Sequence, residues 1–211
     1  MRKVIIVVFS LFTGLVAKAQ YPGYVPLTDL SNFKTQFAAS AQKTSSIKSD
    51  FTQEKNLSML SEKIVSKGKF WFKKSNMIRM EYVQPYKYLV IINKDNVYVK
   101  DDKKENKIST KSNSLFQQIN KITVESVQGS VLNDPDFKTK VFENKGNYLV
   151  EFSPVKKEMQ SLFKNINIII DKKDESVASI DMIEPSGDST LIQFTNKELN
   201  ATIPDALFAI K

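Results

Sequence analysis

Lys87-Tyr-Leu-Val-Ile-Ile-Asn93 is a short apolar run with a lysine at one end and an asparagine at the other. Two similar runs flank it, Met77-Ile-Arg-Met-Glu-Tyr-Val83 before it and Asn96-Val-Tyr-Val-Lys100 after it. Short runs rich in Val, Ile, Tyr and Phe and bounded by polar turn residues indicate β-strands. Neighbouring parallel strands would need a long crossover between them, and here only a few residues separate the runs. The pattern therefore predicts an antiparallel meander.

The same pattern continues over most of the chain. From Ile47 onward, apolar runs alternate with turns of Asn, Asp, Lys and Gly, which predicts a mainly β protein of about eleven strands. A meander of this length tends to curl, and curling into a barrel or half-barrel removes or shortens its exposed edges. The expected strands are 47–55, 57–66, 68–73, 77–83, 87–93, 96–100, 137–143, 147–153, 165–171, 177–184 and 190–196.

Two stretches show helical rather than strand spacing. From Leu30, residues Phe33, Phe37 and Ala41 recur at the helical period, and Thr28, Asp29 or Ser31 could cap this helix. Between 112 and 122 the apolar residues again follow a helical period, which predicts a second, short helical stretch. The tail 203–208 reads as a final turn held in place by Phe208.

The N-terminus has the layout of a secretory signal peptide. Residues 1–19 combine a basic start, an apolar run from Val4 to Val16 and a small-x-small cleavage signal, Ala17-Lys-Ala19. An uncleaved anchor is the alternative, although the run is short for a membrane span of roughly 20 residues. We expect the mature chain, 20–211, to be a single exported domain in a bacterial periplasm.

The amino-acid composition excludes several classes of function. The chain holds 31 basic and 23 acidic residues, and losing Arg2, Lys3 and Lys18 with the leader lowers the net charge from +8 to +5. The lysines are scattered through turns, which argues against a nucleic-acid surface. There is no histidine and no cysteine, so the common zinc, copper and haem ligations and His- or Cys-dependent catalysis are excluded. We expect no enzyme, no metal and no cofactor.

Several central strands are apolar on both faces. In 87–93, Tyr88, Val90 and Ile92 take one face while Leu89 and Ile91 take the other. A plain core with helices packed over the sheet would explain this. A curved sheet around an apolar cavity, covered by the two Phe-bearing helices, would explain it too. Export and the missing catalytic residue types favour the cavity, because a lipid pocket needs apolar walls and little else.

The chain resembles a known family. The order Phe51-Thr-Gln53, Gly68-Lys-Phe-Trp71, Arg79-Met-Glu-Tyr82 and Gln84-Pro85, with Pro204-Asp-Ala-Leu-Phe208 at the end, is similar to the periplasmic outer-membrane lipoprotein carriers of the LolA family. The similarity is collinear over nearly the whole mature chain.

The resemblance implies an unclosed antiparallel β-barrel with a lid of short helices over an apolar cavity. It also implies a monomeric carrier that takes acylated lipoproteins from an ATP-driven releasing complex in the inner membrane to an acceptor at the outer membrane. Because a fold does not fix its ligand, an exported carrier or sensor for a free lipid, glycolipid or lipid-soluble pigment is the alternative.

The candidate ligand-binding residues follow from the strands and helices above. Many family members carry an arginine, at the position of Lys74, that bonds to the lid backbone; here Lys74 or Arg79 would be the latch of the closed form. The expected cavity and lid residues are Phe33, Phe37, Phe70, Trp71, Phe72, Met80, Tyr82, Leu89, Ile91, Leu115, Phe116 and Ile119.

Overall fold

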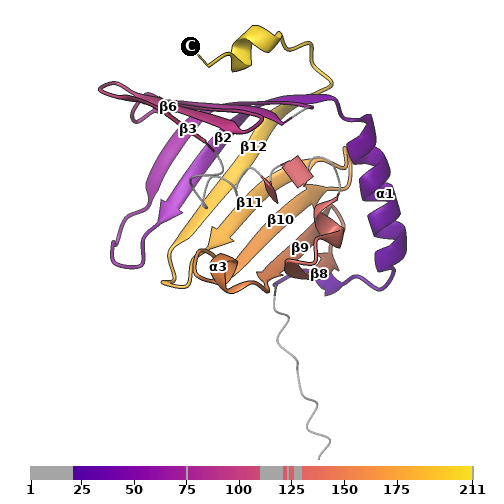
Figure 1. Ribbon diagram of the computed structural model, residues 1–211. Coiled ribbons are helices and arrows are strands. Elements are labelled where there is room, and N and C mark those ends of the chain that lie inside the picture. Colours follow the sequence, from indigo (N-terminus) through magenta and orange to yellow (C-terminus); the bar gives the residue numbers. More distant parts are fainter. Residues whose placement is uncertain (1–20, 75, 110–120, 123, 126–129, 211) are drawn as a thin grey trace, which may run out of the picture.

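The computed structural model describes residues 21–74, 76–109, 121–122, 124–125 and 130–210. In this part of the chain, twelve antiparallel strands form one sheet (Figure 1). The strands are β1 (Val25–Pro26), β2 (Ser46–Asn56), β3 (Ile64–Lys73), β4 (Met77–Gln84), β5 (Tyr88–Asn93), β6 (Asn96–Asp101), β7 (Glu105–Ser109), β8 (Phe137–Glu143), β9 (Asn147–Pro154), β10 (Asn165–Asp171), β11 (Val177–Ile183) and β12 (Ser189–Leu199).

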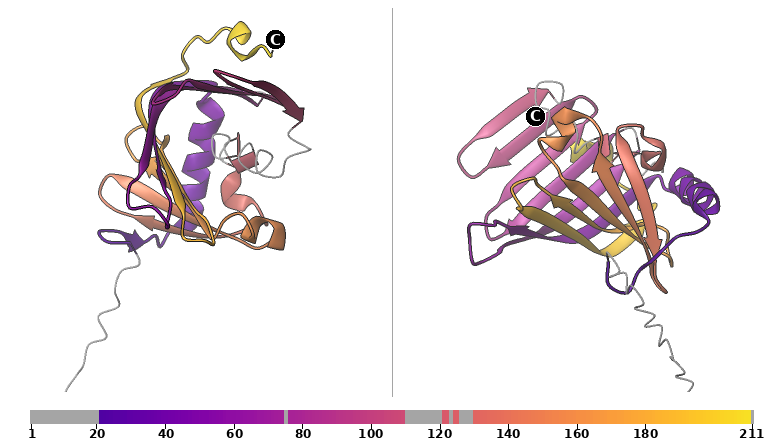
Figure 2. Two further views of the ribbon diagram at one scale, coloured as in Figure 1. Left: turned by 90° about the vertical axis from the view of Figure 1, so that its left-hand side faces the viewer. Right: turned by 90° about the horizontal axis from the view of Figure 1, so that it is seen from below.

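The sheet is an unclosed barrel, as predicted. Its order is β1-β8-β9-β10-β11-β12-β2-β3-β4-β5-β6-β7, so β1 and β7 are its two edges. Two meanders, β2–β7 and β8–β12, join where β12 pairs with β2, with Phe194 opposite Phe51. Figure 2 shows the sheet folding over on itself, with α1 on the inner side and the C-terminal turn on the outer side.

The predicted N-terminal helix is confirmed as α1 (Leu30–Lys43). The Asp29 carboxylate caps it by accepting a hydrogen bond from the main-chain N–H of Asn32 at 3.0 Å. Its apolar stripe, Phe33, Phe37 and Ala41, is buried. Phe33 stacks on Phe37 and meets the Tyr148 ring of β9, so α1 lies over the β8–β10 half of the sheet.

That half of the barrel is filled by the protein's own side chains. The short helices η2 (Val131–Asn133) and α3 (Lys157–Gln160) add Val131, Leu132 and Met159 to the cluster under α1. Between Phe37 and strands β9 and β10 no space remains for a water molecule. The cluster comprises Phe33, Phe37, Ile122, Val131, Leu132, Phe137, Val141, Val150, Phe152, Met159, Phe163, Ile166, Ile168, Ile170 and Ile180.

The predicted strand 57–66 is wrong over most of its length, and only 64–66 belong to a strand. Residues 57–63 form a connection rather than a strand, and β3 runs unbroken through Gly68, where the sequence suggested a break. Gly68 is a packing glycine: a Cβ there would lie 2.3 Å from the Glu81 main-chain oxygen and 2.7 Å from the Phe51 ring. A residue type typical of turns therefore marks a close approach inside the sheet.

Two strands were not predicted. β1 has two residues, and β7 reads Glu105-Asn-Lys-Ile-Ser109 without clear apolar alternation. Both are edge strands, hydrogen-bonded to a neighbour on one side only. β1 is too short to show a pattern, and β7 is mostly polar. The predicted signal peptide and most of the second predicted helical stretch lie outside the described residues. Among the helices that are described, none is long and apolar enough to cross a membrane.

Candidate functional site

The inner face of β2–β6 is the second apolar surface of the barrel. Strand alternation places Phe70 and Phe72 of β3 on this face and Trp71 on the other. The buried members of the cluster, named here the β2–β6 face, are Phe51, Phe70, Phe72, Ile78, Ile92, Val97 and Val124, and Ile47, Met80, Tyr82, Val90, Val99, Ile192 and Phe194 pack against it half-buried.

Aromatic rings connect its strands. Phe51 and Tyr82 meet edge to face with ring centres 5.0 Å apart, and Tyr88 meets Tyr82 in the same way at 5.6 Å. Phe70 packs on Phe194 at 5.0 Å, which ties β3 to β12. Such contacts fix ring positions and contribute about 0.5–1.5 kcal/mol each beyond burial.

The polar groups at this site are few and uncharged. The Tyr82 hydroxyl donates to Oε1 of Gln53 at 2.9 Å. Burial raises the pKa of Tyr82 to about 12, so the phenol stays neutral at physiological pH. Among the described residues, no group of three or more carboxylates could hold a metal ion. Within the described part of the chain, this face offers hydrocarbon contacts, the neutral Tyr82–Gln53 hydrogen bond and the buried hydroxyl of Ser49, which lies opposite Phe70.

The two halves of the barrel differ in what covers them. α1, η2 and α3 contribute side chains to the cluster over β8–β11. On the β2–β6 face, Val124 is the only member from outside the sheet within the described ranges.

The structure divides the predicted binding residues among several places. Phe70, Phe72, Met80 and Tyr82 come together on the β2–β6 face. Phe33 and Phe37 lie in the other half, under α1. Trp71, Leu89 and Ile91 belong to a cluster on the outer face of the sheet. Leu115, Phe116 and Ile119 lie outside the described residues.

The C-terminal segment explains why the central strands are apolar on both faces. Ile203 and the fully buried Phe208, in the turn η3 (Asp205–Phe208), pack on the outer face against Ile91 and Tyr98. The Asn93 side-chain amide donates to the main-chain oxygen of Phe208 at 3.1 Å. The predicted pinning of the tail by Phe208 is thus confirmed, and its contact surface is the outer side of β3–β6.

The two predicted latch residues bind different elements. Nζ of Lys74 donates to the main-chain oxygen of Gln42, in the last turn of α1, at 2.5 Å. Arg79 instead faces the outer side, where it donates to the main-chain oxygen of Leu207 at 3.2 Å and pairs with Glu81 at 2.7 Å. Lys74 therefore holds the inner helix, and Arg79 holds the C-terminal segment.

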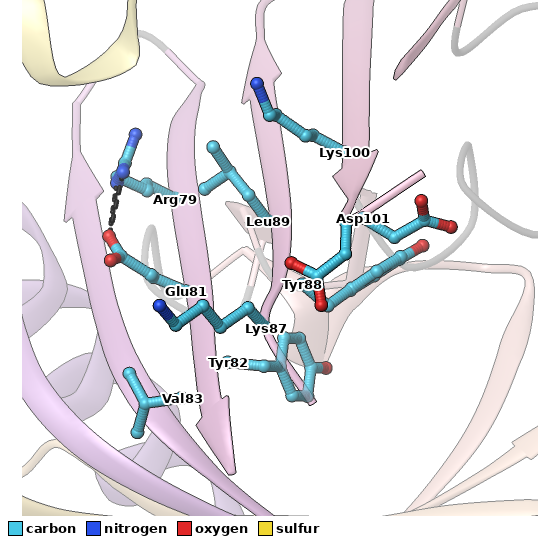
Figure 3. A pocket seen from close by; sticks show the side chains of 10 residues that line it. Arg79, Glu81, Tyr82, Val83, Lys87, Tyr88, Leu89, Lys100 and Asp101 are labelled. Carbon is cyan, nitrogen blue, oxygen red and sulfur yellow. Dashed lines mark hydrogen bonds and ion pairs between the residues drawn. The ribbon is translucent and has the colours of Figure 1, made fainter. Parts of the chain in front are cut away.

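An open pocket of about 310 Å³ lies near the ends of β4, β5 and β6 and shares Tyr82 with the β2–β6 face (Figure 3). Its lining combines charged side chains with apolar and aromatic ones: Lys87, Lys100, the Arg79–Glu81 pair, Tyr82, Tyr88 and Leu89. This mixed lining differs from the apolar cavity expected from the sequence.

The architecture defines the class of protein: an unclosed antiparallel β-barrel with a helix packed on its inner side. Residues 42–211, from the end of α1 to the C-terminus, match the family model described as "Outer membrane lipoprotein carrier protein LolA". The chain belongs to this family.

Solved structures resemble the chain at low identity. A LolA superfamily protein from Nitrosomonas europaea is 8% identical with a TM-score of 0.43, covering 84% of this chain and 97% of the other. A putative outer membrane lipoprotein-sorting protein domain from Vibrio parahaemolyticus is 10% identical with a TM-score of 0.44, covering 84% and 94%. The MucA/MucB complex from Pseudomonas aeruginosa gives 11% identity and a TM-score of 0.48, covering 85% and 60%. No curated protein gives a significant match.

Proposed function

We propose that this protein is a periplasmic carrier that binds the acyl chains of lipoproteins released from the inner membrane and delivers them to the outer membrane. An ATP-driven complex in the inner membrane would load it, and an acceptor at the outer membrane would receive the cargo. Family membership supports the type of cargo.

The observation that carries the proposal is the apolar β2–β6 face. Five neighbouring strands direct Phe, Ile, Val and Met side chains to one side, and several, including Met80 and Val90, are only half-buried by the described chain. Each acyl methylene removed from water against such a surface contributes roughly 0.8 kcal/mol. A hydrocarbon chain can therefore be held without any charged group.

The test is release of an acylated lipoprotein from inner-membrane vesicles. The purified mature protein is expected to bring the acylated cargo into the soluble fraction when the releasing complex and ATP are present. The same lipoprotein without its acyl chains serves as the control and should not form a complex. Failure to bind the acylated form while the protein is folded would refute the proposal.

β4 offers a matched pair of variants for locating the site. Met80 lies on the β2–β6 face and Met77 on the outer face, and both are half-buried. Met80→Gln is expected to weaken cargo binding, because it places an amide against the acyl chains at little change in volume. Met77→Gln should leave cargo binding unchanged. Equal losses in both variants would place the cargo elsewhere.

Native mass spectrometry of the protein as isolated separates this proposal from a carrier of free lipid, glycolipid or pigment. A bound mass equal to that of a complete lipoprotein supports the proposed cargo. A bound mass of a few hundred daltons to about two thousand, the size of single lipids, would favour the alternative.

A further inference from the structure

Exposed apolar side chains gather at one end of the sheet. Eight large hydrophobic residues are exposed among those that the structure describes, and six of them lie in the β2–β3 and β4–β5 connections or the strand ends beside them. Met59 is 95% exposed, Tyr86 80% and Leu60 52%. We call this set the apolar rim: Met59, Leu60, Ile64, Val65, Val83 and Tyr86.

The register shows that the two connections are neighbours. β3 and β4 are antiparallel, and their pairing begins with Lys67 opposite Gln84. The end of β3 that carries Ile64 and Val65 therefore extends past the end of β4, beside the turn that carries Tyr86. In Figure 1 the β2–β3 connection projects at the lower left.

The projecting connection is held in place. The Asp188 carboxylate, in the turn between β11 and β12, accepts hydrogen bonds from the main-chain N–H of Ser58 at 2.7 Å and from its hydroxyl at 2.8 Å. Lys63 pairs with Glu54 across the hairpin at 3.1 Å. Met59 and Leu60 follow this anchor directly, so the fold presents them to solvent in a fixed position.

Lysines outnumber the carboxylates around the apolar rim, where Glu62 is exposed between Leu60 and Lys63 and Glu54 is paired with Lys63. Lys55 and Lys67 lie on the two strands of the hairpin and Lys87 beside Tyr86, and none of the three makes an ion pair within the described residues. Long lysine stems can lie along an apolar surface while their ammonium groups reach lipid phosphates. An apolar tip with basic neighbours is the composition of elements that insert into a membrane interface.

From these observations we propose that the apolar rim docks the protein on an anionic lipid bilayer, with Met59 and Leu60 entering the interfacial layer. A projecting tip requires a complementary pocket in a protein partner, whereas a fluid bilayer surface adapts to it. This membrane contact goes beyond the carrier function and does not rest on acyl-chain binding.

Flotation of the full mature protein with lipoprotein-free vesicles tests the proposal. Wild type should float with vesicles of phosphatidylethanolamine and phosphatidylglycerol, less so at high salt, and weakly with phosphatidylcholine alone. The double variant Met59→Glu, Leu60→Glu should reduce the bound fraction by about tenfold or more. Val155→Glu, at a residue 45% exposed and outside the apolar rim, is the matched control and should bind like wild type.

The outcomes are distinct from those of the cargo assay, because the vesicles carry no lipoprotein. Wild type that does not float, or a double variant that floats equally well, overturns the proposal. Equal binding to phosphatidylcholine alone overturns the role of the lysines. Circular dichroism should show that the exposed substitutions leave the fold intact.

Discussion

Lys74 joins the end of β3 to the last turn of α1 through Gln42. Its ammonium group lies 2.5 Å from the Gln42 main-chain oxygen, and its main-chain N–H donates to Ser45 at 2.9 Å. The side-chain bond therefore connects the sheet to the C-terminal end of α1, the longest helix in the described chain.

Lys74→Ala is expected to loosen the C-terminal turn of α1. The variant loses one charge-assisted hydrogen bond, which at this exposed site contributes about 0.5–1.5 kcal/mol. Amide hydrogen exchange should become faster at residues 41–44 while the rest of the sheet stays protected. Lys74→Arg retains a donor and should exchange like wild type. Lys67→Ala is the control, and an equal effect from it would show that the Gln42 contact is not responsible.

Gly68→Ala should strongly destabilise the protein. The added methyl group would meet the Glu81 main-chain oxygen and the Phe51 ring inside normal contact distance, and neither can move without disturbing β2 or β4. We expect a loss of about 3 kcal/mol in the free energy of unfolding, measured with urea. Gly146→Ala is the matched control, because nothing lies within 4 Å of its added Cβ. It should be neutral or slightly stabilising.

Gly68 also shows where the sequence pattern misleads. Local composition does not distinguish a glycine in a turn from a glycine required by close packing. At Gly68 the difference depends on Phe51 and Glu81, which lie on the two neighbouring strands. Strands between clear polar turns were predictable to the residue: β8 and β10 begin and end where the sequence indicated. The edge strands were missed because β1 has only two residues and β7 shows no clear apolar alternation in its sequence.

Strand alternation also made part of the candidate site predictable. Alternation separates Phe70 and Phe72 from Trp71, but it does not say which face is inside. That choice is made by the C-terminal segment, which covers Trp71, Leu89 and Ile91 from more than a hundred residues away along the chain. Apolar residues on both faces of a strand thus indicated that both faces pack against apolar surroundings. The C-terminal segment covers the outer face.

Phe208→Ala tests the tail as the cover of the outer face. Phe208 is fully buried, and truncation should cost about 3 kcal/mol of unfolding free energy. Trp71, the single tryptophan of the chain, lies in the same cluster with the Arg79 guanidinium 5.8 Å from its ring centre. Its fluorescence should therefore shift to the red in the variant as water reaches the ring. An unchanged spectrum with a large loss of stability would contradict this placement.

Glu125 couples the stability of the protein to pH. Its carboxyl lies near Lys121, Asp134 and Asp136, and Lys121 bridges the two aspartates at 2.6 and 3.0 Å. Desolvation raises the pKa of Glu125 to about 7, Lys121 opposes this rise, and the negative charge of Asp134 adds to it. The folded state therefore holds this proton at a pH where the unfolded chain has lost it.

Glu125→Gln should remove that dependence. Because the folded pKa of about 7 exceeds the ordinary value of 4.5, the contribution of Glu125 to stability is complete below pH 4.5 and is lost as the pH rises through 7. We expect a loss of about 1 kcal/mol over this window, reduced from the full linkage value because solvent screens a partly exposed group. Urea unfolding of both proteins between pH 4.5 and pH 8 gives the test. Glu125→Gln should be the more stable protein at pH 8. If the unfolding free energies of the two proteins change with pH in parallel, Glu125 has the same pKa in the folded and unfolded states and the prediction is wrong.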